Sequence, residues 1–306
     1  MIVSKNLVKD ILRLFFWYPF RWLVLALPLG VVYRIGGVMG DIDRFVSGGK
    51  RIQRMNFNVA EALRLDECEA KSIVKENLRN HLRNTLELMK YTQLNGRCIK
   101  SVVRYDGIDY LDAALDKGKG VILLTAHFGA KQLLQSALVI EGYALNQINF
   151  HMDAEELSYV QQRVSQQQRK SIEDKLSVNF IPAKGFMRPV FKCLKSNEVL
   201  IIAGDGIGLR RHMDMSYQPF GFLGKKMLFP TNAGSLAERT GAAIVPVFVV
   251  REKSRHRIVF EPALNTDPVD SAEPASEYVK VLEKYVSEYP CLWEFWEEFD
   301  DSNLLV

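Results

Sequence analysis

The sequence lacks the short motifs that mark several large enzyme classes. Its 306 residues contain no Gly-x-Ser-x-Gly, no Walker P-loop and no His-Glu-x-x-His, which argues against serine hydrolases, nucleotide hydrolases and zinc proteases. The four cysteines include no Cys-x-x-Cys pair, so neither a zinc site nor a disulfide framework is indicated. We therefore expect no metal, and reduced thiols in a cytoplasmic environment.

A strong charge of one sign and long apolar runs are also missing. Forty lysines and arginines stand against 36 acidic residues, a balance that does not call for nucleic acid and suits a membrane surface. A spanning helix needs about 20 successive apolar residues, but Arg21 and Pro28 interrupt the apolar N-terminal stretch. Because aromatic and basic residues adjoin there, we expect residues 1–40 to form an interfacial helix or a tilted anchor. A buried first helix of a soluble domain is the alternative.

The remainder, residues 41–306, is expected to form one domain. Glycines between residues 36 and 49 indicate a linker, and apolar residues at three- and four-residue intervals then predict a helical prelude within 41–100. In the core, 101–306, short β-rich runs alternate with helical stretches, which is typical of an α/β fold with a mixed, largely parallel sheet flanked by helices. The runs are 121–125, 148–150, 178–181, 199–202 and 244–250, and a last helix is expected at 276–288.

One histidine stands where ligands of α/β folds bind. The apolar run Val121–Thr125 leads through Ala126 to His127, and Gly129 then turns the chain into an apolar helix. This order places His127 at the carboxyl edge of the sheet, near a helix N-terminus, where it could act as a general base. Gln132, about one turn into that helix, can reach the ring and orient it. A capping or core imidazole is the alternative.

Several motifs, in matching order and spacing, resemble a known family. They are Leu27-Pro28, Arg51 with Asn56, His127-Phe128-Gly129, Leu200–Asp205, Pro219–Gly224 followed by Thr231, Leu236–Pro246, and Trp293. Together they are similar to the late acyltransferases of lipid A biosynthesis and to their relatives that acylate mannosylated phosphoinositides. The resemblance covers most of the chain.

In that family the histidine of a His-x4-Asp/Glu motif deprotonates the acceptor hydroxyl, and the acidic residue orients the ring. The resemblance therefore implies an acyltransferase with His127 as the base. The donor would be a thioester of acyl carrier protein or coenzyme A, and the acceptor a membrane glycolipid such as a lipid A precursor. The resemblance also implies that the protein lies on the cytoplasmic face of the inner membrane and that it needs no cofactor besides the acyl donor.

The chain departs from this motif at its acidic position, where it has Gln132. A glutamine carbonyl can accept the imidazole N–H but cannot offset the charge of an imidazolium. Asp205 also follows an apolar strand, so in a parallel sheet it would lie on the same edge and could supply the carboxylate. A simple turn residue within Gly204-Asp205-Gly206 is the equal alternative.

Further residues are candidates for substrate binding. The basic side chains of Arg169, Arg210, Arg211 and Lys225 could hold phosphates of a lipid headgroup or of the acyl donor, although each alone could equally be a solvated surface charge. Main-chain N–H groups near Phe128 and Gly129 could stabilise a developing oxyanion. Thr231 is a candidate because its segment resembles that of the family.

Two other functions stay open. The chain could be a catalytically silent relative that binds glycolipid or carrier protein, with Gln132 as the mark of lost activity. It could also acylate another hydroxylated molecule, such as a glycerophosphate.

Overall fold

The computed structural model describes residues 7–93, 96–149, 160–175, 177–182, 187–206, 216–265 and 272–300. Its centre is a seven-stranded sheet in the order β1-β9-β8-β2-β5-β3-β4. The strands from β8 to β4 run parallel, whereas β9 pairs antiparallel with β8 and parallel with β1. The expected mixed, largely parallel sheet is thus confirmed. The strands are β1 (Val103–Asp106), β2 (Val121–Thr125), β3 (Leu145–Asn149), β4 (Val178–Pro182), β5 (Val199–Ala203), β8 (Ala243–Glu252) and β9 (Arg255–Phe260), and β6 (Tyr217–Phe222) and β7 (Lys225–Pro230) form a separate antiparallel hairpin.

Strand β2 lies inside the sheet between β8 and β5, and all five of its residues are buried. Val121 and Leu123 belong to the core on one face of the sheet, and Ile122 and Leu124 to the core on the other. A parallel strand covered by helices on both faces needs apolar side chains on both. This is the physical reason for the unbroken apolar run in the sequence.

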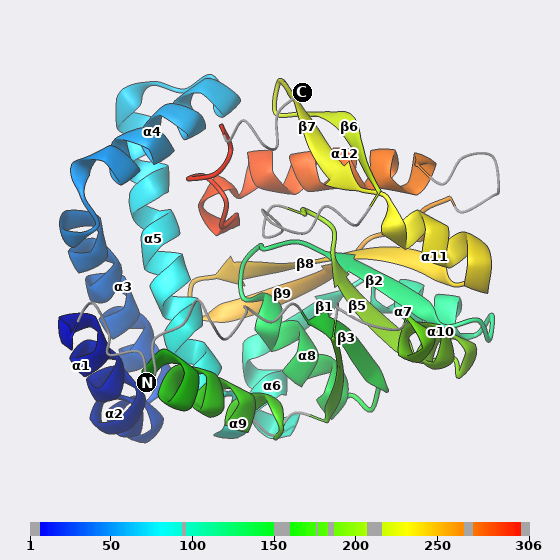
Figure 1. The fold of residues 1–306 in the computed structure, drawn as a ribbon, viewed down its shortest axis with the longest axis horizontal. Helices are drawn as coiled ribbons and strands as arrows, with labels where there is room; N and C mark the ends of the chain where they lie inside the picture. Colours follow the sequence, from blue (N-terminus) through cyan, green and yellow to red (C-terminus); the bar gives the residue numbers. More distant parts are fainter. Residues whose placement is uncertain are drawn as a thin grey trace.

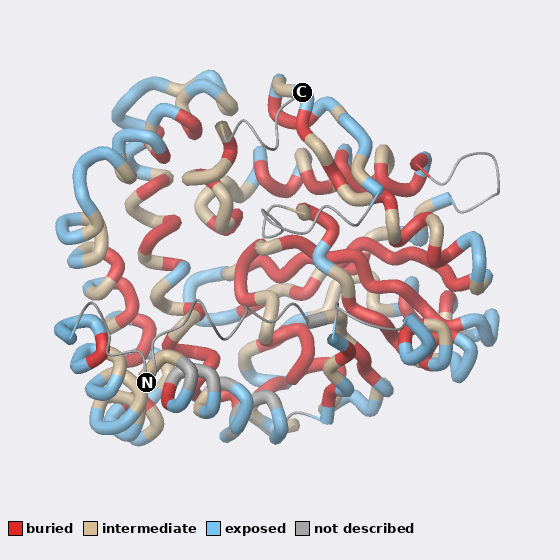
Figure 2. Tube along the Cα trace, in the orientation of Figure 1, coloured by how far each residue is buried: buried red, intermediate tan, exposed pale blue. Residues whose placement is uncertain are grey.

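Helices cover both faces of this sheet, with α12 on one side and α6 and α8 on the other (Figure 1). Strands β2 and β8 between these helices are almost wholly buried, whereas β1, β4 and β9 also carry half-buried and exposed residues (Figure 2). The helices of the first side are α10 (Arg188–Lys195), α11 (Asn232–Thr240) and α12 (Glu273–Glu288), and those of the second are α6 (Gly96–Val102), α7 (Ile108–Leu115) and α8 (Lys131–Ile140). A π-helical turn (Gln161–Gln166) leads into α9 (Gln167–Glu173).

Residues 7–90 form a helical unit beside the sheet (Figure 1). Its elements are α1 (Leu7–Phe15), a π-helical turn (Phe16–Phe20), α2 (Arg21–Ala26), α3 (Leu29–Val46), α4 (Gly49–Leu63) and α5 (Glu67–Lys90). A capping box starts α5, because the Asp66 side chain accepts from the N–H of Glu69 while the Glu69 carboxylate accepts from the N–H of Asp66. Within the described ranges, every helix is too short or too polar to span a bilayer.

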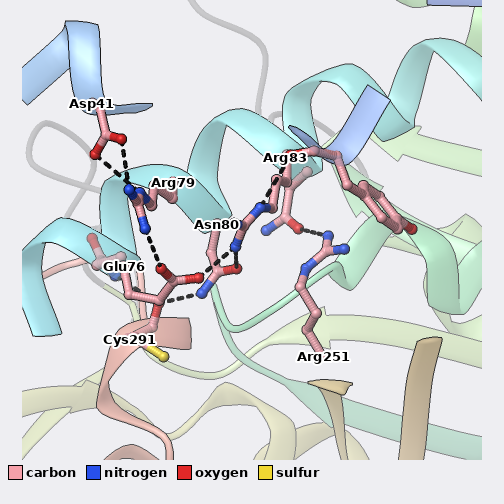
Figure 3. A network of polar contacts seen from close by, with 10 residues as sticks. Asp41, Glu76, Arg79, Asn80, Arg83, Arg251 and Cys291 are labelled. Atoms are coloured by element: carbon pink, nitrogen blue, oxygen red, sulfur yellow. Dashed lines mark hydrogen bonds and ion pairs between the residues drawn. The ribbon is translucent and has the colours of Figure 1, made fainter. Parts of the chain in front are cut away.

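The linker expected at the glycines is wrong, because Gly36, Gly37 and Gly40 lie in the middle of α3. A Cβ on Gly36 would stand 2.9 Å from Cα of Arg83, and one on Gly40 would stand 2.5 Å from Cα of Arg79. The glycines therefore let α3 approach the backbone of α5 closely. An ion pair between Arg79 and Asp41 joins α5 to α3, and a second pair, between Arg83 and Glu76, lies within α5 (Figure 3).

Near its end, α5 carries a buried carboxylate that ties the helical unit to the sheet. Glu87 is 3% exposed. Its Oε2 lies 2.8 Å from Nη2 of Arg251 on β8, and its Oε1 lies 2.8 Å from Nε2 of His256 on β9. The hydroxyl of Tyr33 on α3 donates to the same carboxylate. A single ionised side chain thus connects α3, α5, β8 and β9.

Burial alone would raise the pKa of Glu87, but the attraction of His256 and Arg251 and the hydrogen bonds to the carboxylate outweigh it and lower the pKa to about 2. A carboxylate whose pKa is depressed in the folded state stabilises the fold above its ordinary pKa. That stabilisation is lost as the pH falls toward the folded-state value.

We expect Glu87→Gln to lower the free energy of unfolding by about 3–5 kcal/mol at neutral pH, because it leaves the Arg251 charge buried without its partner. The gap between wild type and variant should narrow as the pH is lowered from about 4.5 toward about 2. Urea unfolding at a series of pH values measures both effects. A gap that stays constant over this pH range would contradict the account.

Candidate active site

Two neighbouring strands place His127 and Asp205 side by side. In the parallel pair β2–β5, Thr125 is in register with Ala203, and each chain continues for two residues beyond that pair to reach His127 or Asp205. The N–H of Gly204 donates to the carbonyl of Thr125 at 2.7 Å, which keeps the two extensions together. The two side chains consequently meet at the carboxyl edge of the sheet, where ligands of such folds bind.

The Asp205 carboxylate holds His127 at two points. Its Oδ1 lies 2.8 Å from Nδ1 of the ring, and its Oδ2 accepts the main-chain N–H of His127 at 2.6 Å. Asp205 is fully buried, whereas the His127 side chain is 28% exposed. Because an ionised carboxylate only accepts hydrogen bonds, the ring proton must sit on Nδ1, and Nε2 keeps its lone pair for a substrate.

The charge of Asp205 is stabilised by its surroundings. Burial would raise the pKa of this carboxyl, but the attraction of His127, the two hydrogen bonds from His127 and the nearby charge of Lys131 together hold the pKa below its usual value. Asp205 therefore stays ionised when the ring beside it gains a proton. The pair has the geometry of a general base and its orienting carboxylate.

Gln132 lies in the first turn of α8 and is half-buried. Among the residues that the structure describes, no hydrogen bond joins Gln132 to His127, and Nδ1 of the ring is bonded to Asp205 instead. Gln132 thus stands at the helical position that was expected, but it does not hydrogen-bond to His127 in the described part of the structure. The role of Gln132 stays a prediction.

The turn after His127 is fixed by Gly129, which has a φ of +56°. A Cβ at this position would lie 1.8 Å from the carbonyl oxygen of Val249. The main chain of Gly129 is also fully used, since its N–H donates to Leu292 at 2.8 Å and its carbonyl accepts from Nδ2 of Asn84 at 2.8 Å. The N–H of Gly129, one of the expected oxyanion donors, is thus already bonded to the carbonyl of Leu292, and an oxyanion role for the main chain here stays a prediction.

Three other predicted residues make contacts of their own in the structure. The Phe128 ring is 1% exposed and packs in the core against Phe248 and Tyr285. Thr231 is buried at the start of α11, where its hydroxyl donates to the carbonyl of Ser216. The ammonium of Lys225 lies 2.9 Å from Glu61.

The predicted basic site cannot be assembled from the described residues. Arg210 and Arg211 lie outside them, and Arg169 is described only as part of the α9 backbone. Of the side chains that are described, no group of His, Cys, Asp and Glu comes together as metal ligands would.

Residues that the sequence did not point to surround the His127 pair. The Phe295 ring lies with its centroid 4.5 Å from that of His127. Glu294 pairs with Lys131 at 3.2 Å, and Asn84 on α5 donates to the carbonyl of Gly129. The aromatic and acidic composition of residues 292–299 was visible in the sequence, but nothing in it indicated which strand end this segment would meet.

Comparisons with known proteins identify the family of the chain. A family model described as bacterial lipid A biosynthesis acyltransferase matches residues 5–297. The chain is 25% identical over 280 residues to a lipid A biosynthesis lauroyltransferase of Escherichia coli K12, covering 88% of this chain and 85% of that protein. It is 22% identical over 284 residues to a phosphatidylinositol mannoside acyltransferase of Mycolicibacterium smegmatis, covering 90% and 88% of the two chains.

Among solved structures, the 1-acyl-sn-glycerophosphate acyltransferase of Thermotoga maritima aligns over 85% of this chain and 96% of its own, with a TM-score of 0.38 and 13% identity. This likeness is too distant to support a conclusion on the site or its substrate.

We expect Gly129→Ala to destabilise the protein by on the order of 3 kcal/mol or more, because the main chain of β8 must move away from the new methyl group. Gly118→Ala is the matched control, since Gly118 also has a positive φ, of +70°, but has no atom within 4 Å of the added Cβ. The control should cost only about 1–2 kcal/mol. Thermal unfolding compares the two, and equal losses would show that the contact with Val249 does not restrict the turn.

Proposed function

Since the chain belongs to the bacterial lipid A biosynthesis acyltransferase family, we propose that it transfers a fatty acyl group from an acyl thioester to a hydroxyl of a glycolipid, with His127 as the general base. The observation that carries this proposal is the hydrogen bond of 2.8 Å between His127 and the buried carboxylate of Asp205. An alcohol is a poor nucleophile until a positioned base removes its proton, and imidazole titrates near neutral pH.

In the proposed reaction, Nε2 of His127 takes the proton of the acceptor hydroxyl as the oxygen attacks the thioester carbonyl. The new C–O bond forms while the carbonyl becomes an oxyanion, and collapse of this intermediate breaks the C–S bond. The imidazolium then returns the proton to the departing sulfur. Asp205 holds Nδ1–H throughout and offsets the positive charge on the ring. No covalent acyl-enzyme is required.

The donor we propose is a thioester of acyl carrier protein or coenzyme A, and the acceptor a membrane glycolipid such as a lipid A precursor. Two relatives support the class of acceptor by their names, as a lipid A lauroyltransferase and a phosphatidylinositol mannoside acyltransferase. No further cofactor enters the proposal, because the base, its carboxylate and the donor account for every step.

We further propose that the helical unit lies on the cytoplasmic face of the inner membrane. Among the described residues, all of the most exposed large apolar side chains except Tyr110 and Met187 fall between residues 7 and 57. Phe15 is 56% exposed, Trp22 64% and Phe45 80%. An exposed apolar surface of this extent is typical of a membrane or protein contact, and aromatic side chains favour the headgroup boundary.

Substitutions in the His127 pair test the catalytic proposal. With purified protein, an acyl thioester and a glycolipid acceptor, we expect His127→Ala to form no acylated lipid detectable by mass spectrometry. Asp205→Asn should lower kcat by about 10²–10⁴-fold, because the amide has only one acceptor oxygen for the two donors of His127 and carries no charge to offset the imidazolium. Gln132→Ala should change kcat much less than Asp205→Asn if Asp205 is the orienting residue.

Each result separates the alternatives. Equal product from wild type and His127→Ala would end the enzymatic proposal and leave a lipid- or carrier-binding relative, for which Gln132 is the distinguishing residue. Full activity of Asp205→Asn would remove the role given to Asp205. Product only with a glycerophosphate or another alcohol would change the acceptor but keep the base.

For membrane binding, we expect Phe15→Glu and Trp22→Glu together to lower the fraction of protein that floats with phospholipid vesicles. Two charges would then have to enter the apolar boundary layer. Met187→Glu is the matched control, because Met187 is 41% exposed but lies far from this surface in sequence. Loss of flotation in the control, or none in the double variant, would count against an N-terminal membrane contact.

A further inference from the structure

The C-terminal segment Cys291–Phe299 lies directly against the turn His127–Gly129. The N–H of Gly129 donates to Leu292 at 2.8 Å, and the N–H of Glu294 donates to the carbonyl of His127 at 2.9 Å. Between these bonds, Phe128 and Trp293 face each other as an antiparallel bridge. The main chain on both sides of the catalytic histidine is thus paired with a segment from the far end of the sequence.

Asparagines on two helices hold the other side of this segment. Nδ2 of Asn77 on α5 donates to the carbonyls of Cys291 and Trp293, at 3.2 and 2.6 Å. One turn further along α5, Asn80 reaches Cys291 (Figure 3), and Asn58 on α4 donates to Trp296 at 2.8 Å. Because these amides are buried, their bonds restrict the segment to one register.

Held in this register, the segment places the side chains of Phe295 and Glu294 next to His127. The Phe295 ring lies 4.5 Å from the imidazole, tilted by 53°. Glu294 pairs with Lys131 at 3.2 Å. Burial would raise the pKa of Glu294, but the attraction of Lys131 and then of His127 holds it below its usual value, so that the carboxylate is charged.

We propose that two residues of the C-terminal segment, Phe295 and Glu294, belong to the active site as positioning residues for His127. Phe295 covers the imidazole, limits its tilt and keeps water from its surface. Glu294 neutralises Lys131, which would otherwise repel the imidazolium and compete with it for the Asp205 carboxylate. The proposal rests on the role of His127 as the base, and it assigns to Glu294 the second negative charge that Gln132 does not provide.

This arrangement explains two features that the His127 pair alone leaves without a purpose. A lysine next to a forming imidazolium would oppose catalysis unless a carboxylate balances it. Burying the amides of these asparagines on α4 and α5 is unfavourable, although they bind a segment without a catalytic group of its own. Their use is explained if the segment must hold Phe295 and Glu294 in place beside His127.

The test compares matched substitutions within the same segment. Phe295→Leu removes the ring beside His127, and its control Phe299→Leu removes a ring that packs on Phe222, Trp293 and Trp296 instead. Glu294→Gln breaks the pair with Lys131, and its control Glu297→Gln breaks the pair with Arg51. All four are assayed with the acyl thioester and glycolipid well below their measured melting temperatures.

We expect Phe295→Leu and Glu294→Gln to lower kcat about tenfold or more with little change in KM, because they disturb the base rather than substrate binding. Phe295→Tyr, which keeps the ring, should restore kcat, and Lys131→Met should restore kcat when added to Glu294→Gln. The two controls are expected to keep kcat within about twofold, although Phe299→Leu lowers the melting temperature.

A second readout does not depend on turnover. The rate at which diethylpyrocarbonate modifies His127, followed by peptide mass mapping, should rise severalfold in Phe295→Leu and stay unchanged in Phe299→Leu. Unchanged kcat and unchanged modification in Phe295→Leu, or an equal loss of kcat in Glu297→Gln and Glu294→Gln, would overturn the inference while leaving the His127→Ala result intact. If the wild type is inactive but diethylpyrocarbonate modifies His127 faster in Phe295→Leu, the proposed function is contradicted, while the covering of His127 by Phe295 is supported.

Discussion

A buried carboxylate must find a partner for its charge, and in this protein Asp205 finds it in His127. Taking an ionised group out of water costs several kcal/mol, which Asp205 offsets with two hydrogen bonds to one residue, one from the ring and one from the main chain. Neither bond could form if β2 and β5 were shifted by a residue, since that shift would turn one side chain to the opposite face. The register of two apolar strands, fixed by their burial, therefore determines whether His127 and Asp205 meet.

The remaining structure keeps that strand edge rigid, and α5 is its main support. One face of the helix packs against the glycines of α3, while its asparagines bind the turn at Gly129 and the C-terminal segment at Cys291 and Trp293. Its last turns carry Glu87, whose partners on β8 and β9 lock the helix against the sheet. The Arg251 guanidinium joins the two systems, since it also donates to Oδ1 of Asn84 at 2.5 Å. Displacing α5 would therefore lower the stability of the fold and disturb the turn after His127 at the same time.

Much of this could be predicted from residue pattern, within limits that have physical causes. The unbroken apolar runs identified β2, β5 and β8, because strands buried on both faces are apolar throughout. The edge strand β4 was recognised from a run that Asn179 interrupts. Strand β3 begins three residues before the predicted run. The polar residue Asn146 hid this part of the strand in the sequence, and it can lie inside the sheet because its amide donates to Glu198. The glycines of α3 suggested a linker because close helix packing and chain flexibility call for the same residue.

Of the site, His127 and the possible role of Asp205 followed from sequence because both lie at ends of recognisable parallel strands. Gln132 was placed by helical spacing, yet spacing gives reach and not contact, and a buried carboxylate is the stronger partner for Nδ1. Phe295 and Glu294 gave no signal, since their approach depends on asparagine contacts made in three dimensions. If these two residues position the base, an acidic residue at position 132 is dispensable here, because the charge it would supply arrives from the opposite end of the chain.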